Sequence, residues 1–462
     1  MTPEQYDAII IGAGQSGGPL ARALAKAGRR VALIERDAVG GTCVNRGCTP
    51  TKTMVAIARV AYLARRASDY GVHTGPVTID FNTVRQRKRD IVDDFRSGVE
   101  KSLKSVAGIT LIYGEVCFTG ATSVEVTLND GGKIQALTAT QIFINTGARP
   151  AVPTLPGLET VLFLDSTSIM ELGTVPEHLI ILGGSYIALE FGQMFRRFGS
   201  RVTVIEQAAR LLGHEDLDVS EEITKILRED GLEILTGTKA MQVSKSGDEI
   251  SLTAETPAGS QAIIGSHLLV AVGRTPNTER LNLEAAGVNT DERGYIKANE
   301  RLETSAPNVY ALGDVKGGPA FTHISYDDYR ILEANLLRGG SRKTTDRLVP
   351  YTMFTDPQLA CVGLSETAAK QAGKNIQVAK LPMSHVARAI ETDETRGFMK
   401  AIIDADTNQI LGCAILGVDG GEIMAVLEVA MLGKLPYPIL RDGVFAHPTL
   451  AESLNNLFLT LN

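Results

Sequence analysis

The chain has 462 residues, of which 44% are hydrophobic and 21% are charged, and its net charge is −7. This composition excludes a disordered chain, and the negative charge argues against a basic nucleic-acid-binding surface. At roughly 100 to 200 residues per domain, the length predicts about three domains and a multidomain enzyme. No apolar run approaches the roughly 20 residues of a membrane helix, and Met1 leads into a strand rather than a signal peptide. We therefore expect a cytoplasmic protein without membrane or nucleic-acid partners.

A dinucleotide-binding pattern opens the chain. The apolar strand Tyr6–Ile11 leads into Gly12, Gly14 and Gly17, which complete the Gly-x-Gly-x-x-Gly fingerprint. The first glycine makes the turn, the second lets a pyrophosphate approach the backbone, and the third lets the following helix pack on the strand. The next strand ends at Glu35, 23 residues after the first glycine. A carboxylate at this place binds a ribose hydroxyl.

Two cysteines follow this pattern directly. Cys43 and Cys48 lie in the stretch Gly-Gly-Thr-Cys-Val-Asn-Arg-Gly-Cys-Thr-Pro-Thr-Lys, ahead of a helical pattern from Thr51 through Ala67. Five residues of regular helix advance about 7.5 Å, beyond the roughly 4.4 to 6.8 Å between disulfide Cα atoms. A bridge therefore needs a distorted turn, which Gly47 can supply. The pair lacks the further ligands of a zinc site, and the remaining alternative is a pair of inert, buried thiols.

The other cysteines lie singly in apolar, strand-like segments, and we interpret them as structural: Cys117, Cys361 and Cys413. So few cysteines exclude a secreted disulfide framework, and a reducing compartment favours a catalytic role for the close pair. The sequence therefore predicts a redox centre at Cys43 and Cys48.

The nucleotide-binding pattern recurs in the middle of the chain. Strand Leu179–Leu182 leads into Gly183 and a helix, and the strand after that helix ends at Glu206, again 23 residues after the first glycine. Ser185 and Ala188 replace the second and third glycines, so we expect phosphate approach and helix packing to be less ideal here.

Two such units imply two dinucleotides. The redox cysteines directly after the first unit assign FAD to it and a nicotinamide nucleotide to the second. Glu206 favours NADH, because a carboxylate accepts the ribose 2′-hydroxyl but repels a 2′-phosphate. Arg210 lies nearby in the sequence and leaves NADPH open.

Four further motifs complete a resemblance that covers essentially the full chain. They are Thr146-Gly147 after a strand, Gly273-Arg274-Thr275-Pro276-Asn277 after another, Ala311-Leu312-Gly313-Asp314, and His447-Pro448-Thr449-x-x-Glu452. With them, the sequence resembles the class I pyridine nucleotide-disulfide oxidoreductases, which include glutathione reductase, dihydrolipoamide dehydrogenase and mercuric reductase.

The resemblance implies an α/β fold with two Rossmann-like dinucleotide-binding domains, for FAD and NAD(P), plus an α+β C-terminal dimerisation domain. It places an FAD-binding domain with the redox disulfide at 1–150 and an NAD(P)-binding domain at 151–275. A central domain at 276–345 would complete the FAD site, and residues 346–462 would form the interface of a homodimer.

The resemblance also implies the site residues. The catalytic residues would be Cys43, Cys48, His447, Glu452, Lys52 and Glu190. The cofactor-binding residues would be Gly12, Gly14, Gly17, Glu35, Thr42, Lys52, Thr146, Gly147, Gly183, Ser185, Tyr186, Ile187, Glu206, Gly273, Arg274 and Asp314, and no metal site is expected.

The family also implies a role for each of the catalytic residues. Cys48 would be the flavin-side thiolate and Cys43 the thiol that attacks the substrate. His447 would reach the disulfide of the other subunit and move the proton, and Glu452 would orient its ring.

Four more residues would serve the cofactors. Lys52 and Glu190 would pair beside the flavin, where a positive charge steadies the reduced ring. Asp314 would hold the ribityl or phosphate region of FAD, and Tyr186 would cover the nicotinamide pocket.

Within the family, the likeness is greatest to bacterial reactive-chlorine-resistance flavoproteins that reduce hypothiocyanous acid. Residues 321–331, 393–397 and 435–442 carry it. We therefore predict an oxidative-stress enzyme that reduces a hypothiocyanous acid-like oxidant or a small disulfide. Arg46, between the cysteines, is a hypothetical attraction point for an anionic oxidant.

Mercuric or copper ion reduction and dihydrolipoamide oxidation are the alternatives. Mercuric reductases carry a vicinal cysteine pair near the C-terminus and lack the His-Pro-Thr histidine. This chain ends Phe-Leu-Thr-Leu-Asn and keeps His447, which argues against that activity.

Overall fold

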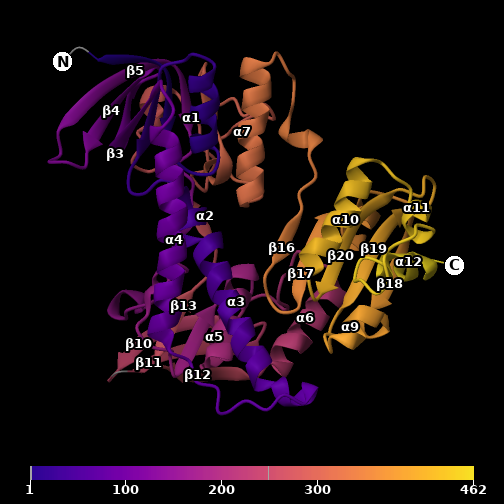
Figure 1. Cartoon of the computed structure of the whole chain (residues 1–462). Coiled ribbons are helices and arrows are strands. Elements are labelled where there is room, and N and C mark those ends of the chain that lie inside the picture. The colour runs from indigo at the N-terminus through magenta and orange to yellow at the C-terminus, as the bar shows by residue number, and fades with distance from the viewer. Residues whose placement is uncertain (1–2, 248, 462) are drawn as a thin grey trace. The chain divides into compact units, whose positions relative to one another are not determined.

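The computed structural model describes residues 3–247 and 249–461 (Figure 1). The chain divides into two compact units, each built from separate stretches of sequence. The first unit runs up to Thr53 and includes Thr83–Ala151 and Gly273–Arg347. The second unit consists of Met54–Asn82, Val152–Val272 and the residues from Leu348 onward. The division into four domains expected from the sequence stays a prediction.

A mixed sheet forms the centre of the first unit. Its parallel strands are β2 (Val31–Glu35), β1 (Glu4–Ile11), β5 (Ile134–Ile144) and β15 (Val309–Ala311), in that order. The long strand β3 (Ile109–Gly120) starts parallel to β2 and continues antiparallel to β4 (Ser123–Leu128), which also pairs with the start of β5. Helices α1 (Gly17–Lys26) and α7 (Thr322–Leu337) lie side by side, and both contribute to one core together with the end of α4 (Phe81–Lys104) (Figure 1).

Strand β1 shows why this sheet is covered on both faces. Its residues Ala8 and Ile10 belong to one hydrophobic core, and Ile9 and Ile11 belong to another. A continuous apolar run is typical of a parallel strand that is buried on both sides. Because the carboxyl ends of parallel strands meet at one edge, the segments that follow β1, β2, β5 and β15 come together there.

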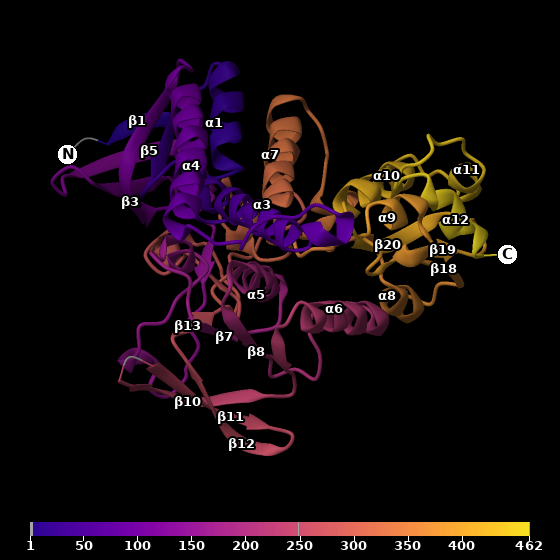
Figure 2. The ribbon, with the colours of Figure 1, turned by 60° about the horizontal axis from the view of Figure 1, so that its bottom comes forward.

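The second unit contains a similar sheet. Its parallel strands, in order, are β13 (His267–Val270), β7 (His178–Leu182), β8 (Arg201–Ile205) and β9 (Glu233–Leu235). An antiparallel extension is formed by β10 (Lys239–Ser246), β11 (Glu249–Thr256) and β12 (Gly259–Gly265) (Figure 2). The accompanying helices are α5 (Tyr186–Phe198) and α6 (Leu217–Glu229).

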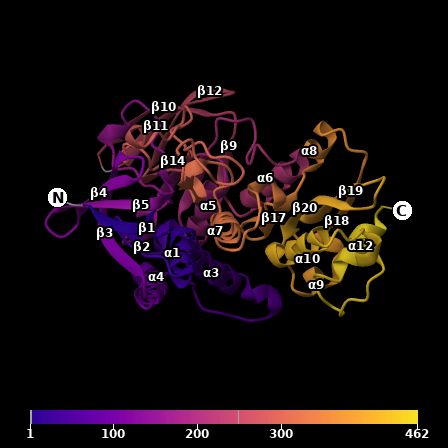
Figure 3. The ribbon, with the colours of Figure 1, turned by 90° about the horizontal axis from the view of Figure 1, so that it is seen from above.

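The C-terminal part of the second unit is an antiparallel sheet with helices. The strands, in order, are β16 (Tyr351–Met353), β17 (Gln358–Gly363), β20 (Ile410–Gly417), β19 (Phe398–Asp404) and β18 (Ile376–Pro382). Helices α10 (Gly420–Leu432) and α12 (Ser453–Leu459) cover one face and share its hydrophobic core (Figure 3). Shorter helices are α8 (Glu366–Gln371), α9 (Ala387–Glu391) and α11 (Pro438–Arg441).

The remaining elements connect these sheets. They are the helices α2 (Gly41–Arg46) and α3 (Cys48–Arg65) and the paired short strands β6 (Ala148–Pro150) and β14 (Arg274–Pro276). Short 3₁₀ helices span Ala67–Tyr70, Leu158–Thr160, Ser168–Glu171, Leu283–Ala286, Gly313–Lys316, Thr344–Asp346 and Met383–His385.

The predicted fold class is confirmed, with two parallel dinucleotide-binding sheets and an α+β C-terminal part. The three cysteines interpreted as structural all lie in strands, with Cys117 in β3, Cys361 in β17 and Cys413 in β20. None of the helices in the described stretches combines the length and the apolar character needed to cross a membrane.

A buried lysine joins the two parts of the second unit. Lys400 of β19 has 2% of its side chain exposed, and its Nζ lies 3.1 Å from Asp216, 3.0 Å from Asp218 and 2.8 Å from Glu366. Burial alone would raise the pKa of Asp216, but hydrogen bonds from Thr367, from the Glu366 N–H and from Lys400 outweigh it and hold the pKa at about 2. The network therefore fixes the start of α6 against the C-terminal sheet.

Replacing Lys400 by methionine should lower the midpoint of thermal unfolding. The side-chain volume is kept, but three carboxylates lose the cation they share, and breaking a buried pair in this way costs about 3 kcal/mol or more. Lys380→Met is the matched control, because Lys380 is 41% exposed and pairs with Asp218 at the surface, where a pair contributes about 1 kcal/mol or less. Equal shifts of the two midpoints would contradict this role of the buried lysine.

Candidate active site

The two clustered cysteines lie on either side of a break between two helices. Cys43 is in α2, and Cys48 is the first residue of α3. Gly47 between the helices has φ −128° and ψ −115°, and a Cβ added to it would lie 2.9 Å from the Thr42 carbonyl oxygen. The distorted turn predicted at Gly47 is confirmed, and it interrupts the helix where a bridge requires it.

The side chains of the two cysteines contact each other. The pKa of Cys43 is raised well above its usual range, first by the side-chain hydrogen bond with Cys48 and then by burial. Cys48 Sγ also lies 3.2 Å from Oγ1 of Thr322, the first residue of α7. Cys48 thus stands at the N-terminus of α3, where the helix dipole is positive, with a hydroxyl within hydrogen-bond distance.

The cysteine segment, which we define as residues 40–48, packs directly on the glycine-rich loop that follows β1. The Gly40 N–H donates to the Ala13 carbonyl at 2.9 Å, and Gln15 Nε2 donates to the Gly40 carbonyl at 2.9 Å. A Cβ added to Gly41 would lie 2.8 Å from Gly14 Cα, so the two backbones touch. The structure thereby joins the sulfur pair to the predicted phosphate-binding loop.

Asn45 holds this segment in its fold. Its side-chain amide donates to the carbonyl oxygens of Ala38, Val39 and Gly41 at 3.4, 2.9 and 2.9 Å, and its oxygen accepts from Arg96 Nε at 2.6 Å. The sequence interpretation passed over Asn45, because nothing local shows that its amide would bond back to three carbonyl groups.

Glu35 lies at the carboxylate end of the first predicted nucleotide site. Its Oε2 accepts from the Ala13 N–H at 2.8 Å and its Oε1 accepts from the Asp37 N–H at 2.9 Å. Burial raises the pKa of Glu35, and backbone hydrogen bonds and the charges of Arg36 and Arg46 partly offset the shift.

The glycines beside Glu35 are sterically required. Gly12 has φ +102°, and a Cβ there would lie 2.3 Å from the Asn145 carbonyl oxygen. A Cβ on Gly17 would lie 2.1 Å from the Gly12 carbonyl oxygen. Helix α1 then starts with no acidic residue in its first turn and no side-chain cap, so the positive end of its dipole suits an anion.

The second nucleotide site repeats the same arrangement. Glu206 Oε2 accepts from the Gly184 N–H at 2.6 Å, and its Oε1 accepts from the Ala208 N–H at 2.7 Å. Gly183 has φ +111° and would clash with the Ala271 carbonyl if it carried a Cβ. Ser185 has φ −99° and ψ 177°, extended backbone that needs no glycine. The substitution expected to weaken this motif therefore falls where the turn tolerates a side chain.

Arg210 is held by the loop that contains it. Its Nη2 donates to the Gly213 carbonyl at 2.9 Å and to the Glu215 carbonyl at 3.0 Å. To reach a 2′-phosphate, the guanidinium would have to give up both bonds.

The Thr146-Gly147 and Gly273–Asn277 motifs contact each other. Thr146 Oγ1 donates to the Asn277 carbonyl at 2.8 Å, and Asn277 Nδ2 donates to the Thr146 carbonyl at 2.9 Å. Arg274 lies 3.5 Å from Asp314, and its buried Nε has no hydrogen-bond partner in the described part of the chain. Burial raises the pKa of Asp314, and Arg274 and Lys316 partly counter it.

One face of α7 ties three parts of the first unit together, and the sequence interpretation did not assign it a role. Besides Thr322, it presents Ser325, whose Oγ lies 2.6 Å from Ser16 Oγ in the glycine-rich loop. Asp328 is fully buried, accepts from the Gly313 N–H at 2.8 Å and pairs with Arg347 at 2.8 Å. All three belong to the segment 321–331 that carried the family likeness, which was the available signal.

His447 and Glu452 form the predicted pair. His447 Nδ1 donates to Glu452 Oε2 at 2.8 Å, which leaves Nε2 of the ring for proton exchange. The histidine side chain is 67% exposed. Both residues lie in the second unit.

The other predicted site residues are placed as follows. Lys52 is half-buried in α3, and Glu190 is 3% exposed in α5, where it accepts from the Phe354 N–H at 2.8 Å. They belong to different units, so their ion pair stays a prediction. Thr42 is exposed in α2, and Tyr186 and Ile187 are half-buried at the start of α5.

Segment 393–397 takes part in ion pairs of the second unit. Glu394 lies 3.1 Å from Arg59, and Arg396 lies 2.6 Å from Asp230, within an ion-pair network of the second unit. Arg197 joins the network through Asp356 at 2.6 Å. Among residues 3–247 and 249–461, no group of three or more His, Cys, Asp or Glu side chains is arranged to hold a metal ion.

The family of this chain is established by comparison with known proteins. Residues 6–328 match the pyridine nucleotide-disulphide oxidoreductase family, and residues 349–458 match its dimerisation domain. The chain belongs to this family. It is therefore a flavin-dependent pyridine nucleotide-disulfide oxidoreductase, and the family uses FAD and NAD(P)H.

Three relatives span nearly the whole chain. The pyridine nucleotide-disulfide oxidoreductase RclA of Escherichia coli (strain K12) is 42% identical over 98% of this chain and 99% of its own. Mercuric reductase of Staphylococcus aureus is 37% identical over 99% of this chain and 82% of its own. Dihydrolipoyl dehydrogenase of Bacillus subtilis (strain 168) is 33% identical over 98% of both.

A solved structure shares the fold closely. It is described as the Cu(II) complex of the HOCl-induced flavoprotein disulfide reductase RclA from Escherichia coli, and it superposes with a TM-score of 0.91 at 40% identity. The match covers 99% of this chain and 100% of that one. The residues around Gly12 and Glu35 fit FAD, because they combine a tight glycine turn, the N-terminus of a helix and a carboxylate for ribose.

Gly41→Ala should lower the FAD content of the purified protein. Gly41 has φ +63°, and its added Cβ would force the cysteine segment away from Gly14. Gly28→Ala is the control, since Gly28 has φ +82° but an added Cβ would meet nothing within 4 Å. The ratio of flavin to protein absorbance should fall in the first variant and stay near the wild-type value in the second. A full flavin content in Gly41→Ala would contradict the close contact of these two loops.

Proposed function

We propose that this enzyme uses NAD(P)H to reduce a small disulfide or an oxidised sulfur species through Cys43 and Cys48, with a hypothiocyanous acid-like oxidant as the favoured substrate. The observation that carries the proposal is the contact between the two thiols across the Gly47 break, on top of the FAD-type glycine-rich loop. The description of RclA as an HOCl-induced disulfide reductase supports an oxidant as substrate.

The substrate half-reaction balances on the two cysteines. His447 of the partner subunit takes the proton of Cys43, and the resulting thiolate attacks the sulfur of hypothiocyanous acid. The S–O bond breaks, and hydroxide leaves as water with the proton that His447 returns. Cys48 then attacks the Cys43 sulfur, thiocyanate leaves, and the disulfide forms. The cysteines lose the electron pair that the oxidant gains. Bound FAD would return an electron pair from the nicotinamide nucleotide to that disulfide.

A homodimer supplies the histidine in this proposal. The family match of residues 349–458 to a dimerisation domain supports it. Apolar side chains exposed on this part of the chain also support it, among them Val429, Leu432, Ile439 and Val444. Glu452 holds Nδ1 of His447, so Nε2 is the atom that carries the proton. A cytoplasmic location completes the proposal, because the cysteines must cycle in a reducing compartment.

Two further roles follow the family pattern. Lys52 and Glu190 are proposed as the ion pair beside the flavin, and the deep burial of Glu190 suits a paired carboxylate. Tyr186, the first residue of α5 after the Gly183 turn, is proposed as the ring that covers the nicotinamide pocket.

Cys43→Ser should abolish turnover with every sulfur oxidant while leaving flavin reduction by NADH fast. The serine hydroxyl cannot form the mixed disulfide, but the nicotinamide and flavin sites are untouched. His447→Gln should slow turnover by about 100-fold or more, the contribution expected of a general acid-base group. Stopped-flow absorbance separates the two half-reactions. Normal turnover in Cys43→Ser would refute the proposed path.

NADH should be the preferred nucleotide. Glu206 offers its carboxylate to the ribose hydroxyls, and Arg210 is held by two carbonyl groups. Glu206→Ala should reduce kcat/KM for NADH by about tenfold, the value of one charge-assisted hydrogen bond, and change that for NADPH less. A wild-type preference for NADPH that Arg210→Ala removes would overturn this assignment.

Reduction of a metal ion, Cu(II) or Hg(II), is a second candidate for the same two thiols. The Cu(II) complex of RclA and the likeness to mercuric reductases favour it. Turnover with Cu(II) or Hg(II) that survives His447→Ala would support a metal reductase, because a metal ion bound by thiolates needs no proton from the histidine. Dihydrolipoamide oxidation ranks third, supported by the dihydrolipoyl dehydrogenase relative.

A further inference from the structure

Arg46 does not lie free beside the cysteines. It is the last residue of α2, and its guanidinium pairs with the carboxylate of Asp37. Both side chains are about half exposed, at 51% and 57%. A cation at the C-terminal end of a helix is favourable in itself, so this position suits Arg46.

Asp37 connects this pair to the first nucleotide site. Its backbone N–H donates to Oε1 of Glu35 at 2.9 Å, while its side chain receives Arg46. The charge of Arg46 also acts on Glu35 directly, because it partly offsets the effect of burial on the pKa of that carboxyl. The strongest influences on the pKa of Cys43 come instead from Cys48, from burial and from Thr322.

We propose that Arg46 is a positioning residue of the FAD site: through Asp37 it holds the turn after Glu35 and so sets the affinity for the adenosine half of FAD. The inference deepens the proposed function, since it depends on FAD binding at Glu35. Arg46, between the two cysteines, then acts on the ribose end of the cofactor and does not guide an anionic oxidant to Cys43.

Only Asp37 separates Arg46 from the carboxylate of Glu35. The adenosine ribose hydroxyls need the carboxylate of Glu35 in a fixed orientation, and two N–H groups, from Ala13 and Asp37, provide it. Ala13 belongs to the glycine-rich loop and is fixed by Gly40. Asp37 lies on an exposed turn, where the pair with Arg46 restrains it.

The test measures FAD binding to the refilled apoenzyme by quenching of flavin fluorescence. Arg46→Gln should raise the dissociation constant for FAD about two- to fivefold, the range expected of one exposed ion pair. Arg46→Lys, which keeps the charge, should recover most of the affinity. ADP, which carries the adenosine half alone, should compete with FAD more weakly against Arg46→Gln by the same factor.

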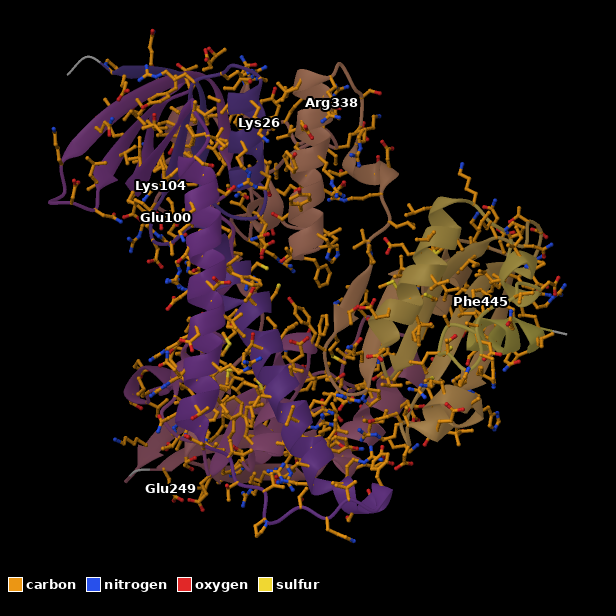
Figure 4. The ribbon with its side chains drawn as sticks, viewed as in Figure 1. Lys26, Glu100, Lys104, Glu249, Arg338 and Phe445 are labelled. Carbon is orange, nitrogen blue, oxygen red and sulfur yellow. The ribbon has the colours of Figure 1, made fainter. Side chains whose placement is uncertain are left out.

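Lys104→Gln is the matched control. Lys104 lies one turn from Glu100 on α4 of the same unit (Figure 4), with the two charges 2.6 Å apart. This variant removes the same charge and an ion pair that is also at the surface, with side chains 62% and 33% exposed, and it should bind FAD and ADP as the wild type does.

Two results would overturn the inference. One is unchanged binding of FAD and ADP in Arg46→Gln. The other is a rise in KM for anionic oxidants but not for neutral ones, which would show that Arg46 attracts the substrate. Glu35→Gln separates this inference from its premise, because unchanged FAD binding in that variant would remove the FAD assignment itself.

Discussion

The contact between the cysteine segment and the glycine-rich loop is the constraint on which the rest of the structure depends. Gly41 and Gly14 touch through their backbones, and Gly40 exchanges hydrogen bonds with Ala13 and Gln15. A cofactor bound on this loop therefore has the sulfur pair beside it in the same compact unit. Electron transfer from flavin to disulfide needs such proximity, and the proposed chemistry needs no large movement within this part of the first unit.

The two predicted nucleotide sites hold their carboxylates in the same way. Each carboxylate at the end of its second strand accepts one N–H from the glycine turn and one from the residue two positions after itself. The surroundings then differ. The turn after Glu35 carries the ion pair of Asp37 with Arg46, whereas the loop after Glu206 holds Arg210 on two carbonyl groups. In the proposed function, the same backbone arrangement serves FAD in one unit and the nicotinamide nucleotide in the other.

Much of this was predictable because the signals are local. The order of strand, glycine, helix and acid defines each nucleotide site, and Gly47 between two cysteines indicates a broken helix. The missed residues act over long separations: Thr322 approaches Cys48, and Asp328 binds the Gly313 backbone. Whether such a side chain bonds to a distant backbone depends on tertiary packing, which no local pattern encodes. The segment 393–397 also carried the family likeness, and its side chains take part in an ion-pair network of the second unit.

Counting thiols tests the central claim most directly. The chain has five cysteines, and the account assigns two of them to a disulfide that NADH opens. Air-oxidised protein, quenched in acid and unfolded, should therefore show three reactive thiols, those of Cys117, Cys361 and Cys413. After anaerobic NADH it should show all five. The same count before and after NADH would contradict the account, because the electrons would then never reach Cys43 and Cys48.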